Sequence, residues 1–448
     1  MDESVQLPAN FLTRYQRAAE ALASASEVRL ISHNDADGIC SATVLCSTLQ
    51  RMGKRFQCTL LRSFEEKVIG PLDKECDLLI VSDMGSSSIT FLEGMKCKVI
   101  VLDHHKPERD SEKLHHLNPH MFGIDGATNA CASSLAMLFS SICHEKNWDL
   151  LEIAFAGLIG DRQNIRGLGG VNLYLYQGGR ARNLIEERPG MLLKEGLVKE
   201  SILRSIDPYI AGVSGNVEGT STLMQEAGLL DNSDMETMDE ATLRKLNSLI
   251  VLRLLKQGRD YDALEESIAP RYYFAASDSY AFDLMTMANA CGRGDVPALG
   301  IQVCLGNARA IEDAVKLREA HVDAVLQSAA LLEKKGFVTG ENIQYFVSPS
   351  PDLSSDLCGL AMQWMADRSR PTFALAQKGG EIRISARGTK KLVHRGLDLG
   401  AAMREAAGSV GGNGGGHDIA SGGKIAQGQE DAFLAALDKT VGAQLKKK

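Results

Sequence analysis

Aspartate and histidine side chains gather in four short segments between residues 33 and 162. The first three segments directly follow short runs of aliphatic residues, and the fourth ends a longer apolar run. Carboxylates combined with imidazoles suit Mn²⁺ or Mg²⁺, whereas zinc sites that include thiolates look different. The four segments are His33-Asn34-Asp35-Ala36-Asp37-Gly38, Ser82-Asp83-Met84-Gly85, Asp103-His104-His105 and Gly160-Asp161-Arg162.

Five aspartates that converged on one pocket would repel one another severely unless cations neutralised them. Two metal ions about 3.5–4 Å apart, bridged by one carboxylate, would do this. One ion would convert a bound water to hydroxide, and both would stabilise negative charge on a phosphorus centre. A single aspartate at a strand end is most often structural or a helix cap. Four such segments in this order indicate a metal centre.

Short strand-like runs alternate with helix-sized segments in this part of the chain. This alternation predicts a doubly wound, mostly parallel α/β sheet. Ligands bind such sheets at the carboxyl ends of the strands, where the polar segments stand. We expect strands at 28–32, 56–61, 78–82 and 99–102, and helices at 8–25, 41–52, 131–146 and 150–159.

The rest of the chain predicts two further parts. Residues 191–330 are polar and strongly helical in pattern, and a second, smaller α/β pattern begins near residue 337. It has expected strands at 343–347, 372–376 and 382–386, a helix near 355–366, a glycine-rich loop, a strand near 424–425 and a final helix. The expected domains are a catalytic domain at 1–190, a helical connector at 191–330 and a substrate-binding α/β domain at 331–448.

Two apolar clusters in the connector are best explained by core packing. One is the aromatic run Tyr272-Tyr273-Phe274, and the other is the helically spaced set Leu249, Ile250, Leu252 and Leu255. An exposed apolar face between residues 220 and 260 would instead favour a protein partner.

Composition limits the class of protein. With 448 residues, 44% of them hydrophobic, the chain is expected to form two or three globular domains. The net charge of −8 argues against a wide basic surface that coats duplex DNA, but it permits a narrow basic cleft. No signal peptide or apolar run long enough to span a membrane is evident, and ten scattered cysteines suit a reducing cytoplasm.

The motifs resemble those of the DHH phosphoesterase superfamily, whose name describes the run Asp103-His104-His105. Within the superfamily, the chain is similar to the archaeal RecJ-like exonucleases. The resemblance covers nearly the whole chain and includes a glycine-rich motif near the carboxyl end, residues 411–423. It implies a metal-dependent exonuclease that hydrolyses single-stranded DNA or RNA.

The resemblance also implies roles for individual residues. Asp83 would bridge two manganese ions (magnesium being the alternative), Asp103 would orient the histidines, and His105 would contact the scissile phosphate. His33 stands where bacterial relatives usually carry aspartate, which leaves open whether it binds a metal directly. The other implied metal ligands are Asp35, Asp37, His104 and Asp161.

A second set of residues is implied to hold the substrate. Glycines let a backbone approach a phosphate closely, and a guanidinium matches phosphate in a bidentate manner. The substrate residues implied by the resemblance are Gly414, Gly415, Gly416 and His417 in the glycine-rich motif, Ser385 and Arg387 before it, and Arg293 in the run Asn289-Ala290-Cys291-Gly292-Arg293.

Three questions about function stay open at this point. Relatives trim strands from either end, and no residue can be assigned to reading a 2′-hydroxyl, so polarity and sugar preference are not fixed. An enzyme for very short oligonucleotides or nucleotides could use the same site. Finally, the connector resembles the region of archaeal RecJ-like proteins that docks on the replisome factor GINS, and the superfamily includes a helicase component without metal ligands, so a replisome scaffold is a further alternative.

Overall fold

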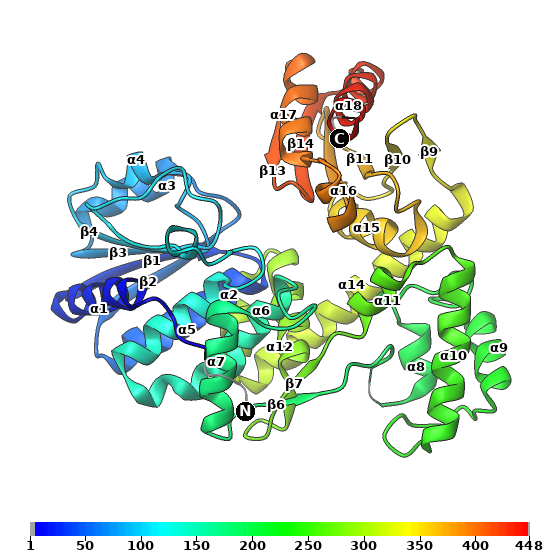
Figure 1. Cartoon of the computed structure of the whole chain (residues 1–448), viewed down its shortest axis with the longest axis horizontal. Helices are drawn as coiled ribbons and strands as arrows, with labels where there is room; N and C mark the ends of the chain where they lie inside the picture. The colour runs from blue at the N-terminus through cyan, green and yellow to red at the C-terminus, as the bar shows by residue number, and fades with distance from the viewer. Residues whose placement is uncertain (1–4, 195, 447–448) are drawn as a thin grey trace. The chain divides into compact units, whose positions relative to one another are not determined.

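The computed structural model of the chain describes residues 5–194 and 196–446, and their packing defines two compact units (Figure 1). The first unit combines the stretches Met1–Gly190 and Ala269–Glu319, and the second combines Met191–Ile268 and Ala320–Lys448. The expected end of the catalytic domain at residue 190 coincides with a unit boundary. The expected connector is divided between the units, so the three-domain division stays a prediction.

The first unit is built on a five-stranded parallel sheet with the order β2-β1-β3-β4-β5. Every residue of β3 is buried, as expected for a parallel strand covered on both faces. The expected doubly wound α/β architecture is therefore confirmed. The strands are β1 (Glu27–His33), β2 (Arg55–Leu61), β3 (Leu78–Ser82), β4 (Lys98–Leu102) and β5 (His115–Leu117).

Helices cover both faces of this sheet (Figure 1). Side chains alternate between the faces along β3, so Ile80 packs under the long helices and Val81 packs under the short ones. The long helices are α1 (Ala9–Ser24), α2 (Ala36–Arg51), α5 (Ala132–Cys143), α6 (Leu151–Gly160) and α7 (Gly170–Ala181). The opposite face carries α3 (Glu66–Ile69), the 3₁₀ turn Gly70–Lys74 and α4 (Ile89–Leu92), and two further 3₁₀ turns are Pro119–Phe122 and Glu145–Leu150.

A second, small antiparallel sheet joins β6 (Glu186–Arg188) to β7 (Arg271–Phe274) and β8 (Ser279–Tyr280). Two of these strands lie in the region expected to be helical. Tyr272 and Phe274 pack on Phe155 of α6, with ring centroids 5.0 and 6.0 Å apart, which confirms the core role expected for these two rings. The unit continues through α12 (Ala281–Arg293) and α13 (Pro297–Cys304) into α14 (Ala308–Lys335), which ends in the second unit.

The second unit contains a six-stranded sheet with the order β13-β14-β12-β11-β10-β9. Only β10 and β11 pair in parallel within it. Phe373 of β11 packs with α17 and α18, whereas Ala374 packs with α15, so helices cover both faces. The strands are β9 (Val338–Thr339), β10 (Gln344–Val347), β11 (Thr372–Lys378), β12 (Glu381–Arg387), β13 (Asn413–Gly416) and β14 (Ala420–Ala426). The helices are α15 (Ser354–Leu360) with a π turn (Ala361–Met365), α16 (Lys390–His394), α17 (Leu399–Ser409) and α18 (Glu430–Leu445).

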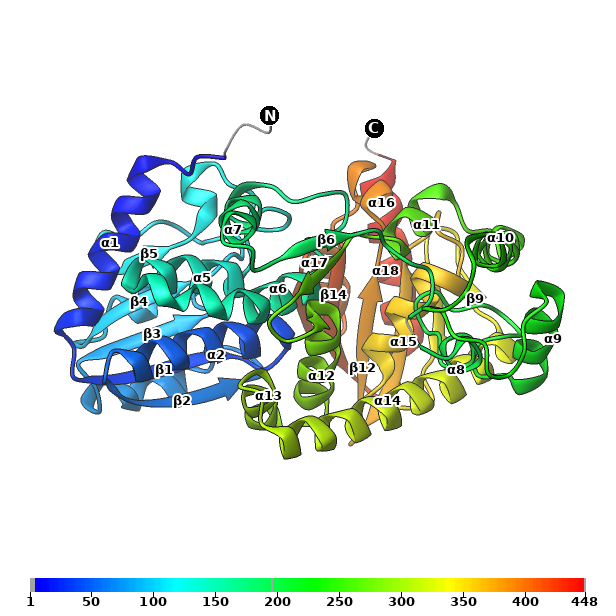
Figure 2. The same cartoon turned by 90° about the horizontal axis from the view of Figure 1, so that it is seen from below.

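Four helices between residues 198 and 267 complete the second unit and lie together in both views (Figures 1 and 2). In α10, residues Leu246, Ile250 and Leu254 form the buried stripe because they repeat every four positions. Leu252 and Leu255 lie off this stripe and are 54% and 49% exposed, so core packing was the wrong expectation for these two. The helices are α8 (Val198–Leu203), α9 (Val217–Ala227), α10 (Glu240–Lys256) and α11 (Tyr261–Ser267).

The glycine-rich motif forms the hairpin of β13 and β14, so the expected loop was wrong. Gly414 pairs with Gly423 across the hairpin. A Cβ atom at Gly414 would lie 2.4 Å from Cγ of Met403, and one at Gly423 would lie 2.8 Å from its sulfur. Glycine is therefore required here because α17 packs directly on the hairpin. Glycine has a low strand propensity, which hides such a hairpin in the sequence.

No helix in the described part of the chain combines the length and the apolar character that a membrane span requires.

Candidate metal centre

The sheet of the first unit reverses its strand order between β1 and β3. From β1 the chain moves to β2 on one side and then crosses to β3 on the other. In open α/β sheets, ligands bind at the carboxyl ends of the two strands that flank such a reversal. His33 ends β1, residues 34–38 follow it, and Asp83 follows β3, so these residues stand at this point.

Asp35 is the N-cap of α2. One carboxylate oxygen, Oδ1, accepts a hydrogen bond from the Gly38 amide at 3.0 Å, and Oδ2 lies 3.0 Å from Nδ1 of His33. Capping satisfies a backbone donor of the first turn and places negative charge at the positive end of the helix. A Cβ atom at Gly38 would lie 2.3 Å from the His33 carbonyl oxygen, so only glycine permits this tight turn.

Asp37 is buried and is held by the start of α5. Its two oxygens accept hydrogen bonds from the amides of Ala132 and Ser133, at 2.6 and 2.9 Å. Burial raises the pKa of Asp37 to about 6, and the neighbouring carboxylate of Asp83 contributes to this rise. A Cβ atom at Gly157 would lie 2.7 Å from Oδ1 of Asp37, so α6 approaches the carboxylate closely. This carboxylate is fixed in place and destabilised as an anion, as expected for a metal ligand considered without its cation.

Asp83 lies between two imidazoles. Oδ1 is 3.4 Å from Nε2 of His104, and Oδ2 is 3.5 Å from Nδ1 of His33. Its backbone is left-handed, with a φ of 58°, a strained conformation that is uncommon outside glycine and clusters at functional sites. Burial opposes its ionisation, but hydrogen bonds from His104 and His33 hold its pKa below the ordinary value. Each Asp83 oxygen therefore faces a different histidine, which is the geometry expected of a carboxylate that bridges two metal ions.

His104 is oriented by a backbone carbonyl. Its Nδ1 donates a hydrogen bond to the Gly126 oxygen at 2.7 Å, because a carbonyl can only accept. The other nitrogen, Nε2, points toward Asp83 and lies 3.3 Å from Asp161, the C-cap residue of α6. Fixing one ring nitrogen in this way sets the tautomer that leaves the other available to a metal. A Cβ atom at Gly126 would lie 2.0 Å from the His104 oxygen, so this contact requires glycine.

Asp103 is not one of the side chains whose atoms could share a metal ion. It holds His105 in place instead. Its Oδ1 accepts hydrogen bonds from Nδ1 of His105 at 2.7 Å and from the His105 amide at 3.1 Å. Its Oδ2 accepts from the Ser86 amide at 2.8 Å. Burial opposes ionisation of Asp103, but the imidazole of His105 lowers its pKa to about 2. An ionised, buried carboxylate therefore fixes the ring of His105.

A polar layer that was not predicted from the sequence lies behind Asp103. The Ser86 hydroxyl lies 2.9 Å from Nε2 of the buried His116, and Asn118 donates both to that hydroxyl and to the His105 carbonyl, at 2.9 and 2.8 Å. Gln163 donates to the Gly126 oxygen, which His104 also uses. In the sequence, only the histidine pair at 115–116 could have drawn attention to this layer.

The implied ligands form three overlapping groups, in each of which the ligand atoms lie within 4.8 Å of one another. Asp83 and His104 each belong to two groups, as expected for a site that holds more than one cation. Burial, followed by the charge of Asp37, raises the pKa of Asp161 well above its ordinary value, so its ionised form is disfavoured at this position. This donor set of carboxylates and imidazoles fits Mn²⁺ or Mg²⁺. The groups are His33, Asp35 and Asp83; Asp37, His104 and Asp161; and Asp83, His104 and His105.

The expected substrate residues of the second unit lie on β12, on β13 and in the turn between β13 and β14. Arg387 ends β12 and pairs in register with Ala420, whose carbonyl accepts from the His417 amide at 2.8 Å. The guanidinium donates to the Ser355 hydroxyl at 2.7 Å, and the hydroxyls of Ser385 and Ser354 are 3.2 Å apart. Gly414 to Gly416 form the neighbouring strand β13, whereas Arg293 lies in the first unit at the end of α12.

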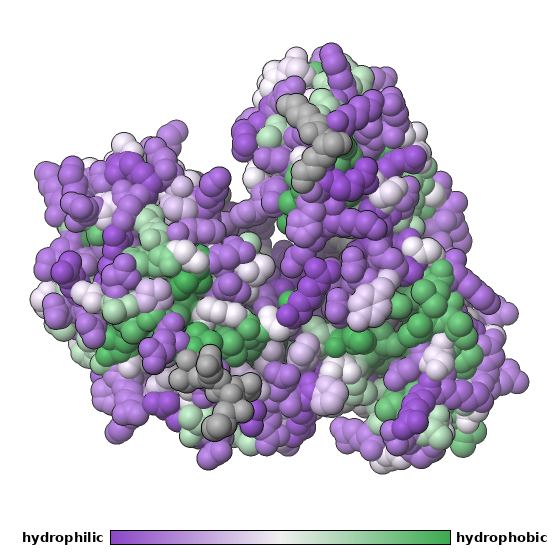
Figure 3. All heavy atoms as spheres, in the orientation of Figure 1, coloured by the Kyte–Doolittle hydropathy of each residue, from purple (hydrophilic) through white to green (hydrophobic). Residues whose placement is uncertain are grey.

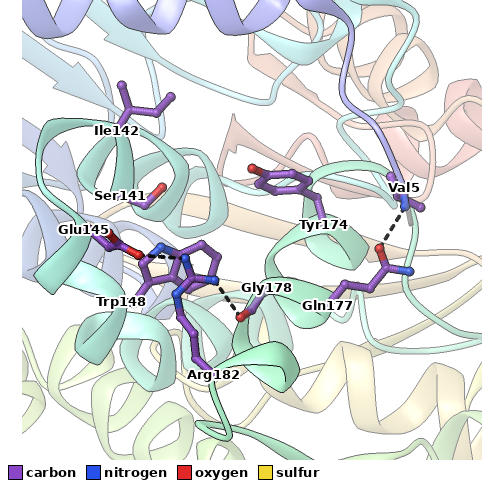
Figure 4. Close-up of a pocket in the computed structure, with 9 residues that line it drawn as sticks. All are labelled: Val5, Ser141, Ile142, Glu145, Trp148, Tyr174, Gln177, Gly178 and Arg182. Carbon is purple, nitrogen blue, oxygen red and sulfur yellow. Dashed lines mark hydrogen bonds and ion pairs between the residues drawn. The ribbon is translucent and has the colours of Figure 1, made fainter. Parts of the chain in front are cut away.

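A pocket of about 500 Å³ lies elsewhere in the first unit (Figure 4). Its Arg182 guanidinium is 4.3 Å from the Trp148 ring centroid and 3.2 Å from the Glu145 carboxylate. Gln177 accepts from the Val5 amide at 2.8 Å. None of the aspartates or histidines of the metal centre is among the described residues that line this pocket, so it has no part in the chemistry proposed below.

Comparison with known proteins places these features in a family. The model of the DHH family N-terminal domain matches residues 27–159, and that of the DHHA1 domain matches residues 342–443. An uncharacterized protein of Methanocaldococcus jannaschii, MJ0831, is 30% identical over 432 residues, which is 94% of each chain. The chain belongs to the DHH family. The model named archaeal Cdc45 matches residues 196–319 of this DHH-family chain, in keeping with an archaeal RecJ-like member.

Solved structures with low sequence identity share the fold of this DHH-family chain. RecJ from Thermus thermophilus, in complex with Mn²⁺, matches with a TM-score of 0.63 and 17% identity over 99% of this chain. The match spans 56% of that longer RecJ chain. An exonuclease RecJ bound to manganese matches with a TM-score of 0.60 and 16% identity, over 98% of this chain and 96% of its own. CDC45 from Entamoeba histolytica matches with a TM-score of 0.63 and 13% identity, over 97% and 99%.

Proposed function

We propose that this DHH-family chain is a metal-dependent exonuclease that hydrolyses phosphodiester bonds of single-stranded nucleic acid. The observation that carries the proposal is the position of Asp83, whose two oxygens face His104 and His33 in two overlapping ligand groups. Two divalent cations that share one carboxylate are the arrangement used for in-line attack on phosphate esters. The RecJ structures bound to manganese support the same reading.

Some residues of the centre would bind the metal ions, and others orient these ligands. His33, Asp35 and Asp83 would hold one Mn²⁺ or Mg²⁺ ion, and Asp37, His104 and Asp161 would hold the other with Asp83 between them. The bound metals would supply a hydroxide nucleophile and neutralise charge on the phosphate. The Gly126 carbonyl keeps Nε2 of His104 directed at this site. Direct ligation by His33 is part of the proposal, because its Nδ1 faces Asp35 and Asp83 while Nε2 is directed at the Arg62 carbonyl.

His105 would contact the scissile phosphate. Its ring lies 4.4 Å from that of His104, between centroids, and Asp103 fixes its Nδ1. A carboxylate that accepts from one imidazole nitrogen sets the orientation of the other and stabilises the protonated ring, as in hydrolases with a histidine–aspartate pair. The ring can then donate a hydrogen bond to phosphate. Asp103 acts through His105 and is a positioning residue.

The second unit would grip the strand end. Arg387 and Ser385 stand beside the hairpin that carries Gly414, Gly415, Gly416 and His417. The planar guanidinium of Arg387 can bind a phosphate through two parallel hydrogen bonds. Arg293, at the end of α12, is a further phosphate contact in this proposal. Gripping the backbone rather than stacking the bases suits a chain in which only 5% of residues are aromatic.

Single-stranded DNA and RNA oligonucleotides labelled at either end would test the activity. Each would be incubated with the protein in Mn²⁺, Mg²⁺ or EDTA. Two variants would be assayed in parallel: Asp83→Ala, and the control Asp313→Ala, which removes a half-buried aspartate of α14. We expect stepwise shortening that requires metal, disappears in Asp83→Ala and persists in Asp313→Ala. Dinucleotides in the same assay separate an exonuclease from an enzyme of very short substrates. Failure to cut any oligonucleotide under either metal would contradict the proposal.

A replisome role is the second candidate. The archaeal Cdc45 match at residues 196–319 and the fold of Entamoeba CDC45 favour it. Apolar residues also gather on the surface where α10 and α11 are drawn (Figure 3), and Leu252 and Leu255 of α10 and Tyr261 of α11 are exposed. A partner such as GINS could cover this area. Leu252→Asp with Leu255→Asp should abolish binding of purified GINS in a pull-down while exonuclease activity persists; binding unchanged by these substitutions would contradict this surface as the contact.

A further inference from the structure

The carboxyl-terminal end of α12 meets the loop that carries the metal ligands after β1. Asn289 Oδ1 accepts a hydrogen bond from the Ala36 amide at 3.2 Å, across 253 residues of sequence. Ala36 is the first residue of α2 and stands between Asp35 and Asp37. The first amides of a helix have no partner within the helix, so they depend on such outside acceptors. Asn289 therefore holds the backbone between two of the implied ligands.

Two different side chains accept hydrogen bonds from the backbone amides at the start of α2. Asp35 Oδ1 is occupied by the Gly38 amide, and Asn289 serves Ala36. The remaining oxygen of Asp35, Oδ2, faces His33 Nδ1. Asn289 therefore holds the backbone beside Asp35, while the Asp35 carboxylate is both the cap and an implied ligand.

The backbone of α12 also touches the same loop directly. The Asn34 side chain donates a hydrogen bond to the Gly292 carbonyl at 3.4 Å. A Cβ atom at Gly292 would lie 2.0 Å from the backbone carbonyl oxygen of Asn34. Gly292 is buried, so no other residue type fits this approach. Two independent contacts therefore fix the loop from the same helix end.

A third contact reaches the loop after β2. Asp295 lies 3.0 Å from the Arg62 guanidinium, and the Arg62 carbonyl is 3.2 Å from Nε2 of His33. The ion pair is exposed, so its own contribution is small. Together, these contacts join residues 289–295 to the loop after β1 and to the loop after β2, which position Asp35 and His33. We call residues 289–295 the brace.

We propose that the brace completes the metal centre from outside the DHH domain and that Asn289 is a positioning residue for the metals. The inference rests on the metal centre of the proposed function and adds a residue that does not touch the metals. The brace lies in the region matched by archaeal Cdc45, 196–319, whereas the DHH match ends at residue 159. This region therefore has a role inside the first unit in addition to any partner surface.

Calorimetric titration of the full chain with Mn²⁺ tests the proposal without a turnover measurement. Loss of a hydrogen bond that orients metal ligands typically weakens metal affinity about 10–100-fold, and we expect a loss in this range for Asn289→Ala. Asn289→Asp keeps an acceptor for the Ala36 amide and should stay within about threefold of the unchanged chain, well below that loss. The control is Asn307→Ala, which removes an equivalent cap, the acceptor for the Ala310 amide at the start of α14.

The possible results distinguish a failure of the proposed brace from a failure of the proposed metal centre. Equal Mn²⁺ affinity in Asn289→Ala and the unchanged chain would overturn the brace and leave the proposed function standing. An equal loss in Asn307→Ala, or a loss in Asn289→Asp as large as that in Asn289→Ala, would overturn the role of this hydrogen bond. Absence of Mn²⁺ binding in the unchanged chain would contradict the metal centre and the brace together.

Discussion

At the scale of single residues, the chemistry depends on which atom each side chain presents. The sequence predicts that aspartates and histidines converge, because they follow strands that share one sheet edge. It does not predict that Asp83 adopts a left-handed backbone or that His104 is oriented by the Gly126 carbonyl. Both features depend on contacts between segments distant in sequence. For the same reason, the polar layer of Ser86, His116 and Asn118 was missed.

The link between Asp103 and His105 gives a prediction about catalysis. Asp103→Asn keeps the size of the side chain but removes the negative charge that orients Nδ1 of His105. We expect the turnover number on a single-stranded oligonucleotide to fall by about 10²–10⁴-fold, the range typical when a catalytic imidazole loses the carboxylate that orients it. Mn²⁺ affinity, measured by calorimetry, should change by less than the roughly 10–100-fold typical of lost ligand orientation, because Asp103 holds His105 rather than the metals. A fall in affinity that matches the fall in turnover would place Asp103 among the ligands instead.

His116 gives a prediction about pH. Burial lowers its pKa to about 4, outweighing Asp103 and Asp110, which raise it, while Arg14 lowers it further. Because the unfolded chain takes up this proton at a higher pH, stability is lost as pH falls from about 6.5 toward 4. The loss at pH 5 is about 2 kcal/mol in the free energy of unfolding. Urea unfolding at pH 7 and pH 5 should show this extra loss in the unchanged chain but not in His116→Gln. Identical pH dependence in the two proteins would contradict a neutral, buried His116.

At the scale of elements, the alternating pattern predicts most strands and helices to within a few residues. The clearest failures are the glycine hairpin and the strands β7 and β8, whose local signals are weak and which depend on packing. Gly414 has a low strand propensity, but the approach of Met403 on α17 leaves no room for a side chain. The exposed positions of α10 also depend on the tertiary neighbours, which periodicity alone does not reveal.

Two glycines test this packing: Gly414 of β13, which faces α17, and Gly408, which lies within α17. Gly414→Ala places a methyl group 2.4 Å from Cγ of Met403 and should destabilise the second unit by about 1–3 kcal/mol. Gly408→Ala is the matched control, because its Cβ atom would meet nothing within 4 Å inside α17. It should leave stability unchanged or raise it by up to about 1 kcal/mol. Equal effects of the two substitutions in urea unfolding would contradict close packing of α17 on the hairpin.

At the scale of the whole molecule, the chain forms two units, and the region between the DHH and DHHA1 domains contributes to both. Composition alone predicts more than one domain and a globular fold. It does not predict that residues 269–319 return to the first unit, because that return depends on the packing of α12 against α2 and α6. The acidic net charge of −8 agrees with a centre that concentrates carboxylates.

The separation into units predicts a selective effect of metal on thermal unfolding. A ligand present at about 100 times its dissociation constant stabilises the folded state by about 2.7 kcal/mol. Because the described ligand groups all lie in the first unit, Mn²⁺ should raise only one of two transitions in differential scanning calorimetry. EDTA should reverse the shift, and Asp83→Ala should abolish it. A shift of both transitions, or a full shift in Asp83→Ala, would contradict metal binding at this centre.

The two-metal centre is tested most sharply by the anomalous scattering of manganese in crystals of the protein grown with Mn²⁺. We expect two peaks about 3.5–4 Å apart at the carboxyl ends of β1 and β3. One oxygen of Asp83 should contact each metal, with His33 and Asp35 on one side and Asp37, His104 and Asp161 on the other. A single peak, or two peaks that do not share Asp83, would contradict the two-metal centre on which the proposed hydrolysis depends.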